Sequence, residues 1–370
     1  MLRRLGVVLV VLLILIGGLL YRTLYSGGYF KTVTSSFAGT CTAVPGVVGA
    51  EDMELDRTTG ELFISSQDRR PFPLPPGEHQ KQGDIFLARL DRPDEAPQSL
   101  TQMMSATLHP HGISLYRDAN GKRTLAVVNH VELETSEIVL FDVIDRAGEA
   151  PQLSMRRHVQ DPLIHDANDV TLVGHDAFYV TNDHGSQTAL GRMLEDYLLV
   201  PRGDVVFYDG KAAKVAASGF NYTNGINRSA DLATIYVAES TARTVDILHR
   251  DMTSGMLSLV RSIFLDAGPD NIDVDPDGNL WIAAHPKLLA FLEHARDASK
   301  LSPSAVLKVD PTAEKDAVRL VYSNTGEEMS GSSTAVFDGK RLAIGAVFEP
   351  KFLNCDYVDR TSTSTRSEAP

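Results

Sequence analysis

The residues with the clearest capacity for chemistry are acidic and amide side chains that could hold a divalent cation. Each stands at the head of a short apolar segment, and the set is Glu51, Asn168, Asn224, Asp270 and Asn271. The carboxylates balance the charge of one divalent ion, and the amides add the neutral oxygen ligands that calcium accepts. Zinc would require histidine or cysteine ligands, which the set lacks. The set therefore predicts a calcium site, although any one of these residues alone is more typical of a turn.

Two further carboxylates directly follow members of this set. Asp52 follows Glu51, and Asp169 follows Asn168. Consecutive side chains of a strand point to opposite faces, so Asp52 and Asp169 should lie on the other side. There they could bind a second ion, with the backbone carbonyl near Ile113 as a further ligand.

Two histidines could supply a general base beside such a metal. His111 stands at the head of its own apolar segment, and His130 ends the next one. A neutral imidazole could take a proton from water that attacks an ester or lactone carbonyl, with His130 orienting His111. The alternative is that each is a hydrogen-bonded structural histidine. Asp183, His184 and His285 also end apolar segments, and they are candidates for the pocket wall or for contacts with the ligands.

Other classes of site are not indicated. The sequence contains no G-x-S-x-G nucleophile elbow, no H-E-x-x-H zinc motif and no phosphate-binding glycine loop. The formal net charge of −13 argues against a nucleic-acid partner, because no basic surface is suggested. A small ester or lactone is therefore the expected ligand.

A repeated unit of two apolar segments positions these residues. The first segments begin at Glu51, His111, Asn168, Asn224, Asn271 and Gly331, and the second segments centre on Ile64, Val127, Tyr179, Tyr236, Trp281 and Ile344. Short apolar runs between turn signals indicate an all-β protein. Six units of about fifty residues match the four-stranded blades of a six-bladed β-propeller. The polar turns would then converge at one end of a central calcium-binding tunnel.

Residues 1–25 differ from the rest and are predicted to form a hydrophobic helix. Arg3 and Arg4 precede an uncharged run from Leu5 to Leu20, which is typical of a secretory signal. No small-residue cleavage site closes the run, so an uncleaved signal anchor is favoured over a cleaved peptide, which would give a secreted protein. The arginines would keep the N-terminus in the cytosol and place the body in the lumen or outside the cell.

Composition divides the remaining chain into a linker, one domain and a tail. Residues 26–37 are predicted to be a linker and residues 358–370 a disordered tail, because both are rich in small polar residues. A single propeller domain is predicted over 38–357. Within it, 190–200 and 287–298 have helical spacing, and each could be an ordinary surface helix, a lid or a membrane-facing patch.

The chain has two cysteines, which lie near opposite ends of the predicted domain. In an oxidising compartment Cys41 and Cys355 could form one bridge that closes almost the whole domain. The alternative is two unrelated buried thiols. A clasp between the first and last elements is what a ring-shaped fold would use.

Several of these segments, taken in order, resemble the serum paraoxonase/arylesterase family of lactonases. The resemblance covers about 41–355 and rests on GAEDMEL (49–55), PHGIS (110–114), VVNH (127–130), NDV (168–170), TNDH (181–184), TNGIN (223–227), DNIDVDPDGNLWIAAHP (270–286) and the last cysteine. Several motifs in the same order are far more specific than any one of them.

The resemblance implies a six-bladed propeller with two calcium ions in its central tunnel. The family's catalytic-calcium ligands fall on the five residues named first, and its structural-calcium ligands fall on Asp52, Asp169 and the carbonyl of Ile113. Its histidine dyad falls on His111 and His130, and its disulfide falls on the two cysteines. Members also commonly keep the N-terminal hydrophobic segment, which agrees with an anchor that brings the protein to a membrane.

The predicted function is calcium-dependent hydrolysis of lactones and aryl esters. One alternative is a propeller hydrolase of the gluconolactonase or diisopropylfluorophosphatase type, and another is a non-catalytic, calcium-stabilised propeller that binds a partner. The histidine pair beside an intact ligand set favours an enzyme. The segments 66–71 and 287–292 depart from the family, being more charged and more helical respectively. Both should border the pocket, so the preferred substrate can differ from that of the family.

Overall fold

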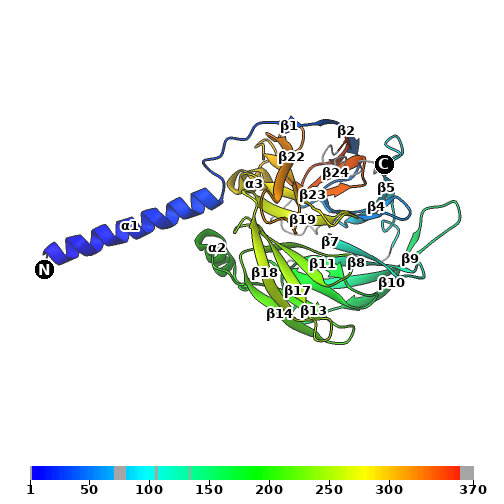
Figure 1. Ribbon diagram of the computed structural model, residues 1–370, viewed down its shortest axis with the longest axis horizontal. Helices are drawn as coiled ribbons and strands as arrows, with labels where there is room; N and C mark the ends of the chain where they lie inside the picture. Colours follow the sequence, from blue (N-terminus) through cyan, green and yellow to red (C-terminus); the bar gives the residue numbers. More distant parts are fainter. Residues whose placement is uncertain (1, 71–80, 105–106, 133–134, 359–370) are drawn as a thin grey trace, which may run out of the picture.

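The computed structural model describes residues 2–70, 81–104, 107–132 and 135–358, and it has a ring of β-sheets with one long helix projecting from it (Figure 1). Six sheets surround a central axis, and each has four strands except one, which has five. The prediction of an all-β, six-bladed propeller with an N-terminal helix is confirmed. The predicted tail, 358–370, lies almost entirely outside the described residues.

In each of the first three blades, the strands follow one another in chain order from the centre of the ring to its edge. They consist of β3 (Ala50–Asp56), β4 (Glu61–Ser66), β5 (Asp84–Arg89) and β6 (Gln98–Ser99); β7 (Pro110–Arg117), β8 (Arg123–Glu132), β9 (Thr135–Ile144) and β10 (Gln152–Val159); and β11 (Ala167–Leu172), β12 (Phe178–Asn182), β13 (Gly203–Tyr208) and β14 (Ala213–Phe220).

The last three blades repeat this order, and two of them gain a strand from the N-terminal segment. They consist of β15 (Thr223–Arg228), β16 (Thr234–Glu239), β17 (Thr244–Arg250) and β18 (Leu257–Phe264); β19 (Gly268–Val274), β20 (Leu280–His285), β21 (Ser304–Val309) and β22 (Val318–Asn324) with β1 (Ser36–Phe37); and β23 (Ser332–Phe337), β24 (Arg341–Ala346) and β25 (Lys351–Tyr357) with β2 (Gly39–Pro45).

Hydrophobic packing between neighbouring blades closes the ring. Six buried clusters each join two adjacent blades, and the cluster with Val44, Ala50 and Val336 joins the last blade to the first. The innermost strands also contact one another in turn, from β3 around to β23 and back to β3. The core of this fold therefore lies between the sheets rather than at the axis. There each Å² of apolar area removed from water contributes roughly 25 cal/mol.

The two ends of the domain meet in the last blade. β2 pairs antiparallel with β25, and Cys41 lies directly opposite Cys355 in that register. The two cysteines form a disulfide across 314 residues. The predicted bridge is therefore confirmed, and it fastens the strand that closes the ring.

Every innermost strand has a register shift at its head. The shifts lie between Ala50 and Asp52, Pro110 and Ile113, Ala167 and Val170, Thr223 and Ile226, Pro269 and Ile272, and Ser332 and Thr334. A bulge bends a strand and re-aims the side chains that it contains. All five predicted calcium ligands and His111 fall inside these shifts, so the irregular backbone decides where they point.

The N-terminal helix is exposed along its apolar part. α1 (Leu2–Ser26) has 25 residues, and its segment Arg3–Ser26 is long and apolar enough to cross a membrane. At about 1.5 Å per residue it exceeds a hydrocarbon core of about 30 Å. Its C-terminal end is held by the body, because Arg22 donates to the carbonyls of Leu198 and Leu199, and Thr23 donates to the carbonyl of Tyr197 at 2.6 Å.

Two short helices lie at the end of the ring to which α1 is attached (Figure 1). They are α2 (Ala189–Leu198) and α3 (Leu288–Arg296), at the two places where the sequence has helical spacing. α2 begins at Thr188, whose hydroxyl accepts a hydrogen bond from the Gly191 amide, and it ends where Leu199 adopts a φ of 52°. Both caps satisfy backbone groups that a helix end leaves unpaired.

The segment predicted as a linker, 26–37, contacts the body instead of spanning free space. Ser36 and Phe37 form β1 on the edge of β22. The Phe37 ring packs against Tyr322 and Tyr357, with centroids 5.5 Å away in each case. The small polar residues predict a linker. The pairing of β1 with the edge strand β22 and the aromatic contacts of Phe37 fix the last part of this segment.

Candidate active site and calcium centre

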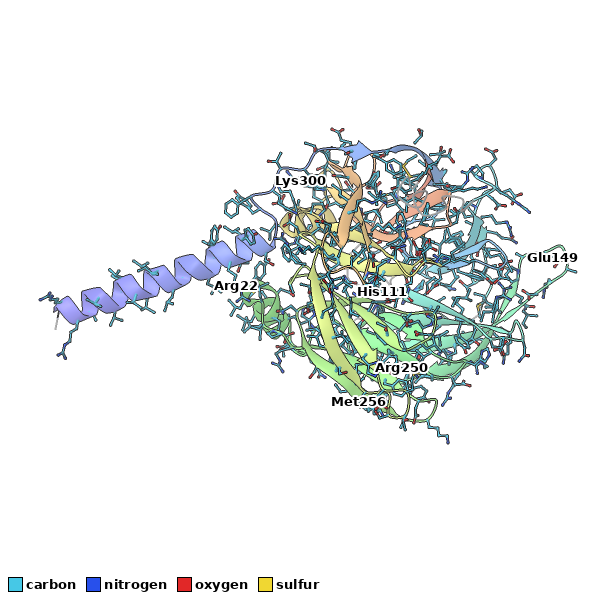
Figure 2. All side chains as sticks on the ribbon, viewed as in Figure 1. Arg22, His111, Glu149, Arg250, Met256 and Lys300 are labelled. Carbon is cyan, nitrogen blue, oxygen red and sulfur yellow. A yellow bond between two sulfur atoms is a disulfide. The ribbon has the colours of Figure 1, made fainter. Side chains whose placement is uncertain are left out.

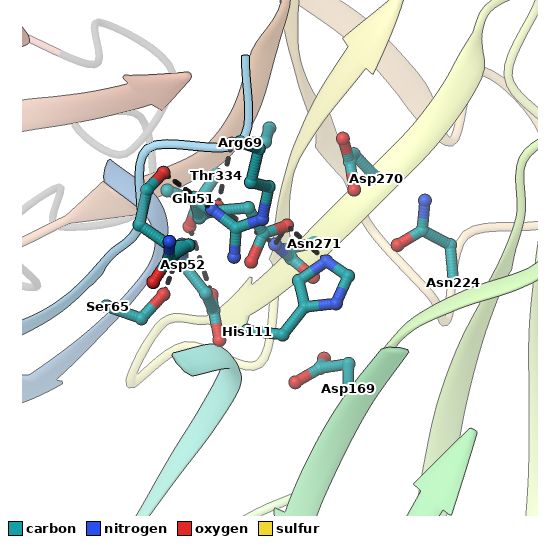
Figure 3. A network of polar contacts seen from close by, with 12 residues as sticks. Glu51, Asp52, Ser65, Arg69, His111, Asp169, Asn224, Asp270, Asn271 and Thr334 are labelled. Carbon is teal, nitrogen blue, oxygen red and sulfur yellow. Dashed lines mark hydrogen bonds and ion pairs between the residues drawn. The ribbon is translucent and has the colours of Figure 1, made fainter. Parts of the chain in front are cut away.

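The five predicted calcium ligands converge at one end of the tunnel. They come from the heads of β3, β11, β15 and β19, and all of them are buried. Figure 3 shows Glu51, Asn224, Asp270 and Asn271 facing a common space, with His111 beside them. Residues more than 200 positions apart are thereby brought together.

Hydrogen bonds orient the amide groups so that their oxygens remain free. Asn271 donates from Nδ2 to Glu51 Oε1 at 2.9 Å, and Asn224 donates from Nδ2 to the hydroxyl of Ser240 at 3.0 Å. Four of the buried oxygens that lack a hydrogen-bond partner in the described part of the chain belong to this set: Glu51 Oε2, Asn168 Oδ1, Asn224 Oδ1 and Asn271 Oδ1. A buried acceptor without a partner costs about 1–3 kcal/mol, and one bound cation would satisfy all four.

The fifth member of the set has a histidine partner. Asp270 Oδ2 lies 2.8 Å from His285 Nε2, and His285 stacks on Phe291 with ring centroids 4.0 Å apart. Burial raises the pKa of Asp270, whereas His285 opposes the rise. Burial also acts to raise the pKa of Glu51, but His111, Arg69 and Asn271 bring it below its usual value. The donor set, the unpartnered oxygens and the paired carboxylate together fit a calcium ion.

The predicted second site is built differently. Asp52 Oδ2 accepts the amide of Ile113 at 2.8 Å, and Asp169 Oδ2 accepts the amide of Ile226 at 2.7 Å. Burial raises the pKa of Asp52 well above its usual value, and the negative charges of Asp169 and Glu51 add to the rise. A cation would relieve this repulsion. The oxygens already accept backbone amides, however, so the fit to an ion is weaker than at the first site.

The two predicted catalytic histidines are in direct contact. His111 Nδ1 and His130 Nε2 are hydrogen bonded at 2.9 Å, and His111 Nε2 lies 3.5 Å from Glu51 Oε1. His130 Nδ1 is 3.3 Å from the hydroxyl of Ser136. Burial lowers the pKa of His130 well below its usual value, and the nearby His111, Arg69 and His109 lower it further. His130 is therefore neutral, and one nitrogen of His111 faces the ligand cluster.

Asp183 and His184 lie farther along the pocket wall. Burial raises the pKa of Asp183, and the charge of Asp166 adds to the rise, whereas a hydrogen bond from Asn168 opposes it. His184 is 3.3 Å from Asp166 and 2.9 Å from Asp196 of α2. Asp166, Asp183 and His184 could also hold an ion by their spacing. Of the three residues predicted for the pocket, His285 contacts the predicted ligand Asp270, Asp183 neighbours the predicted ligand Asn168, and His184 is hydrogen bonded to α2.

A second ring of pocket residues comes from the ends of the second strands. Arg69, Ser240 and Phe348 follow β4, β16 and β24 and line the pocket, as do His184 after β12 and His285 at the end of β20. The histidines are predicted individually from the sequence, whereas Arg69 is included only within the segment 66–71, which is expected to border the pocket. The six-fold repeat could have indicated Ser240 and Phe348, because it places the ends of all the second strands at the same end of the tunnel.

The pocket above the ligands has a volume of about 630 Å³. Part of its wall is polar and belongs to the tunnel. The opposite wall is apolar and contains Leu288, Phe291 and Leu292 of α3, with Met193 of α2 and Gly27 at the end of α1. The pocket can therefore hold a small organic molecule whose apolar part lies against α3 and whose polar part reaches the tunnel.

The chain is similar to known proteins over most of its length. The arylesterase family model matches residues 41–357. Serum paraoxonase/arylesterase 2 of Gallus gallus is 35% identical over 327 residues, which cover 85% of this chain and 88% of the relative. The human protein of the same name is 33% identical over 333 residues, with the same shares covered. Serum paraoxonase/lactonase 3 of Mus musculus is 32% identical over 314 residues, covering 83% and 86%.

Solved structures show the same fold at low sequence identity. A luciferin-regenerating enzyme superposes with a TM-score of 0.54 and 14% identity, covering 86% of this chain and 96% of that one. A gluconolactonase of Xanthomonas campestris superposes with a TM-score of 0.51 and 16% identity, covering 88% and 95%.

Proposed function

The chain belongs to the arylesterase family and is a hydrolase, and we propose that it hydrolyses lactones and aryl esters with the help of calcium. The observation that carries the proposal is a cluster of four buried, unpartnered oxygens beside a hydrogen-bonded histidine pair. A site that only bound calcium for stability would need the oxygens but not the histidines. Glu51, Asn168, Asn224 and His111 line one pocket of suitable size, and Asn271 and His130 are hydrogen bonded to Glu51 and His111.

The ligands for the proposed ion are Glu51, Asn168, Asn224, Asp270 and Asn271. Calcium bound there would polarise the substrate carbonyl and favour the negative charge that develops on its oxygen. The chain supplies the orientation of the ligands. Asn271 is fixed by Glu51, Asn224 by Ser240 and Asp270 by His285.

His111 is the proposed general base. Its Nε2 faces the ligand cluster and can accept a proton from a water molecule there. Its Nδ1 is held by His130, which fixes the plane of the ring. Because its pKa is lowered, His130 favours the neutral form and presents a nitrogen lone pair or an N–H rather than a second positive charge.

The N-terminal helix and the disulfide are consistent with the secretory pathway. We further propose that α1 anchors the protein in a membrane with the propeller on the lumenal or outer side. Flotation of the full chain with liposomes tests this, against a variant that begins at residue 27. Equal flotation of both forms would contradict the anchor.

The decisive experiment is a hydrolysis screen with controlled metal content. Aliphatic lactones and phenyl acetate are offered to the purified protein, then to protein treated with EGTA, and then to treated protein with calcium or magnesium restored. Hydrolysis should disappear with EGTA and return with calcium, because the all-oxygen ligand set suits the larger ion. Activity that persists after complete calcium removal would show that the proposed mechanism is wrong.

A further inference from the structure

Arg69 is a cation that the proposed reaction does not use. It follows β4, is partly buried, and lies in the pocket wall. Its Nη2 donates to the carbonyl of Pro110 at 2.7 Å, and its Nη1 donates to the carbonyl of Gln67 at 3.3 Å. Figure 3 shows its guanidinium pointing into the same space as Glu51, Asn271 and His111. Both of its observed partners are neutral.

Two other positive groups of the pocket have acidic partners, and a third, Arg296, is exposed to solvent. Arg192 lies 3.4 Å from Asp166, and His184 contacts Asp166 and Asp196. Arg69, by contrast, forms no ion pair with any carboxylate in the parts of the chain that the structure describes. The neighbouring Arg70 is engaged elsewhere, because it donates to the carbonyl of His294 at 2.8 Å and packs over Phe348.

Charge balance makes Arg69 the unmatched group. Burial lowers the pKa of Arg69, and the negative charges of Glu51 and Asp270 in the same pocket act to raise it. Two carboxylates match the double charge of one calcium ion. If they held such an ion, they would no longer compensate Arg69, and its partly buried guanidinium would remain in the pocket wall without a matching charge. Such a group is stabilised by an anion from the ligand.

We propose that Arg69 forms an anion subsite, so that the preferred substrates are lactones or esters that carry a carboxylate close to the scissile carbonyl. This inference rests on the proposed hydrolase function and specifies its substrate class. A guanidinium has five N–H donors in a planar fork that fits a carboxylate. Two of its nitrogens donate to backbone carbonyls, and the remaining hydrogens can face the pocket.

The position of the subsite sets where the carboxylate must lie on the substrate. Arg69 is bonded to Pro110, which directly precedes the proposed base His111. The anion therefore lies near the carbonyl that is attacked, whereas the apolar wall around Phe291 and Leu288 takes the hydrocarbon part. A carboxylate at the far end of a long chain would not reach Arg69 while its ester group lies at the ligand cluster.

A matched pair of substrates tests the preference. The pair is 5-oxotetrahydrofuran-2-carboxylate and its carboxamide, which share the lactone ring and differ in charge. In the wild type kcat/KM should be higher for the carboxylate, and Arg69→Gln should lower the ratio of the two values by about 10- to 100-fold, as expected for a lost charged hydrogen bond. Arg70→Gln, the same change one residue away, should leave the ratio unchanged. If Arg69→Gln does not fold, Arg69→Met replaces it.

Equal losses for both substrates would overturn the subsite, because Arg69 would then act on the reaction in general. A binding measurement separates this inference from the hydrolase proposal. Calorimetric titration of the calcium-loaded protein with glutarate should show a Kd that rises by about 10- to 100-fold in Arg69→Gln. If glutarate binding depends on Arg69 but no lactone is hydrolysed, the function fails and the subsite stands. If lactones are hydrolysed and neither glutarate binding nor the substrate ratio depends on Arg69, the subsite fails alone.

Discussion

At the scale of single residues, the site is defined by which buried polar atoms have partners and which do not. The side-chain amides of Asn271 and Asn224 donate hydrogen bonds to Glu51 and Ser240. Their oxygens have no hydrogen-bond partner. His111 is placed between His130 and Glu51. These hydrogen bonds orient side chains that are common in turns, so that their free atoms face one common site.

The role of His111 can be tested by substitution. His111→Gln should lower kcat for lactones by about 10² to 10⁴, the usual contribution of a general base. Calcium affinity should be unchanged, because His111 is not a proposed ligand. His175→Gln is the control, since His175 contacts Thr124 and Asp118 and is not part of the pocket wall. Full activity of the His111 variant would show that the assignment is wrong.

His285 should act on calcium through Asp270. His285→Gln should weaken calcium binding by about 10- to 100-fold, as expected when a partner of a metal-ligating carboxylate is lost. Calorimetric titration with calcium measures the effect directly, and His249→Gln on the exposed side of β17 (Thr244–Arg250) provides the comparison. An unchanged affinity would mean that Asp270 does not bind the ion or does not depend on its neighbour.

At the scale of elements, bulges and close blade contacts place the ligands. A regular strand would point the consecutive side chains of Asp270 and Asn271 to opposite faces. The register shift between Pro269 and Ile272 allows both to serve one site. Gly112 and Gly225 permit the neighbouring strand heads to approach, because a Cβ at Gly112 would lie 2.2 Å from Asp169 Oδ1 and one at Gly225 2.4 Å from the Asp270 carbonyl.

Gly112→Ala should therefore push the second and third blades apart. Overpacking of this kind costs about 1–3 kcal/mol, and denaturant unfolding should show that loss. Gly174→Ala is the matched control, because its new Cβ would meet Ala177 at an ordinary 3.8 Å. Its effect should stay within about 0.5 kcal/mol, as at most surface positions. Equal stability of the two variants would contradict the tight contact.

The docking of α2 should depend on pH. Burial acts to lower the pKa of His184, but its bonds to Asp166 and Asp196 and the charge of Asp183 raise it to about 10. A raised pKa stabilises the folded protein fully below the ordinary value of 6.5, and this stabilisation is lost as the pH rises towards 10. The melting temperature of the wild type should exceed that of His184→Gln most at pH 6, and the gap should close by about pH 10. His249→Gln should show no such trend.

At the scale of the whole molecule, the ring is closed by the chain ends, and α1 projects from the body (Figures 1 and 2) with its last residues in the pocket wall. β2 completes the last blade, and the disulfide fixes it there. Ser26 donates to the carbonyl of Thr241, and Arg243 donates to the carbonyl of Tyr25 at 2.9 Å. The end of the exposed helix is thus attached at the rim of the pocket, so anchor and site lie on the same end of the propeller.

Loss of the disulfide should lower stability without removing the site. The bridge closes a loop of 314 residues, for which the chain-entropy model gives about 5–6 kcal/mol as an upper estimate. The double variant Cys41→Ser/Cys355→Ser should unfold at a lower denaturant concentration than the oxidised wild type and still bind calcium when folded. Reduced wild type should behave like the double variant. An unchanged midpoint would mean that β2 holds its place without the bridge.

Local patterns in the sequence were enough to predict much of this molecule. Alternating apolar runs, six times repeated, predict the blades because strand formation and burial on one face are local properties. Helical spacing likewise predicts α2 and α3. The residue types at the strand heads indicate an oxygen-ligand site, and the motif order identifies the family. The interpretation of 26–37 as a linker missed β1, because its partner β22 lies almost 290 positions away.

Only the tertiary structure decided how the site is put together. The contacts of His111 with His130 and of Asn224 with Ser240 are made within one blade, between neighbouring strands. Arg69 points to Pro110 of the next blade, and Asn271 donates to Glu51 of another blade. Such contacts are set by the packing of whole sheets and by bulges, and no single segment encodes them. The sequence by itself therefore determined the fold and the chemical nature of the site, whereas its geometry and the unmatched charge of Arg69 arose from closing the ring.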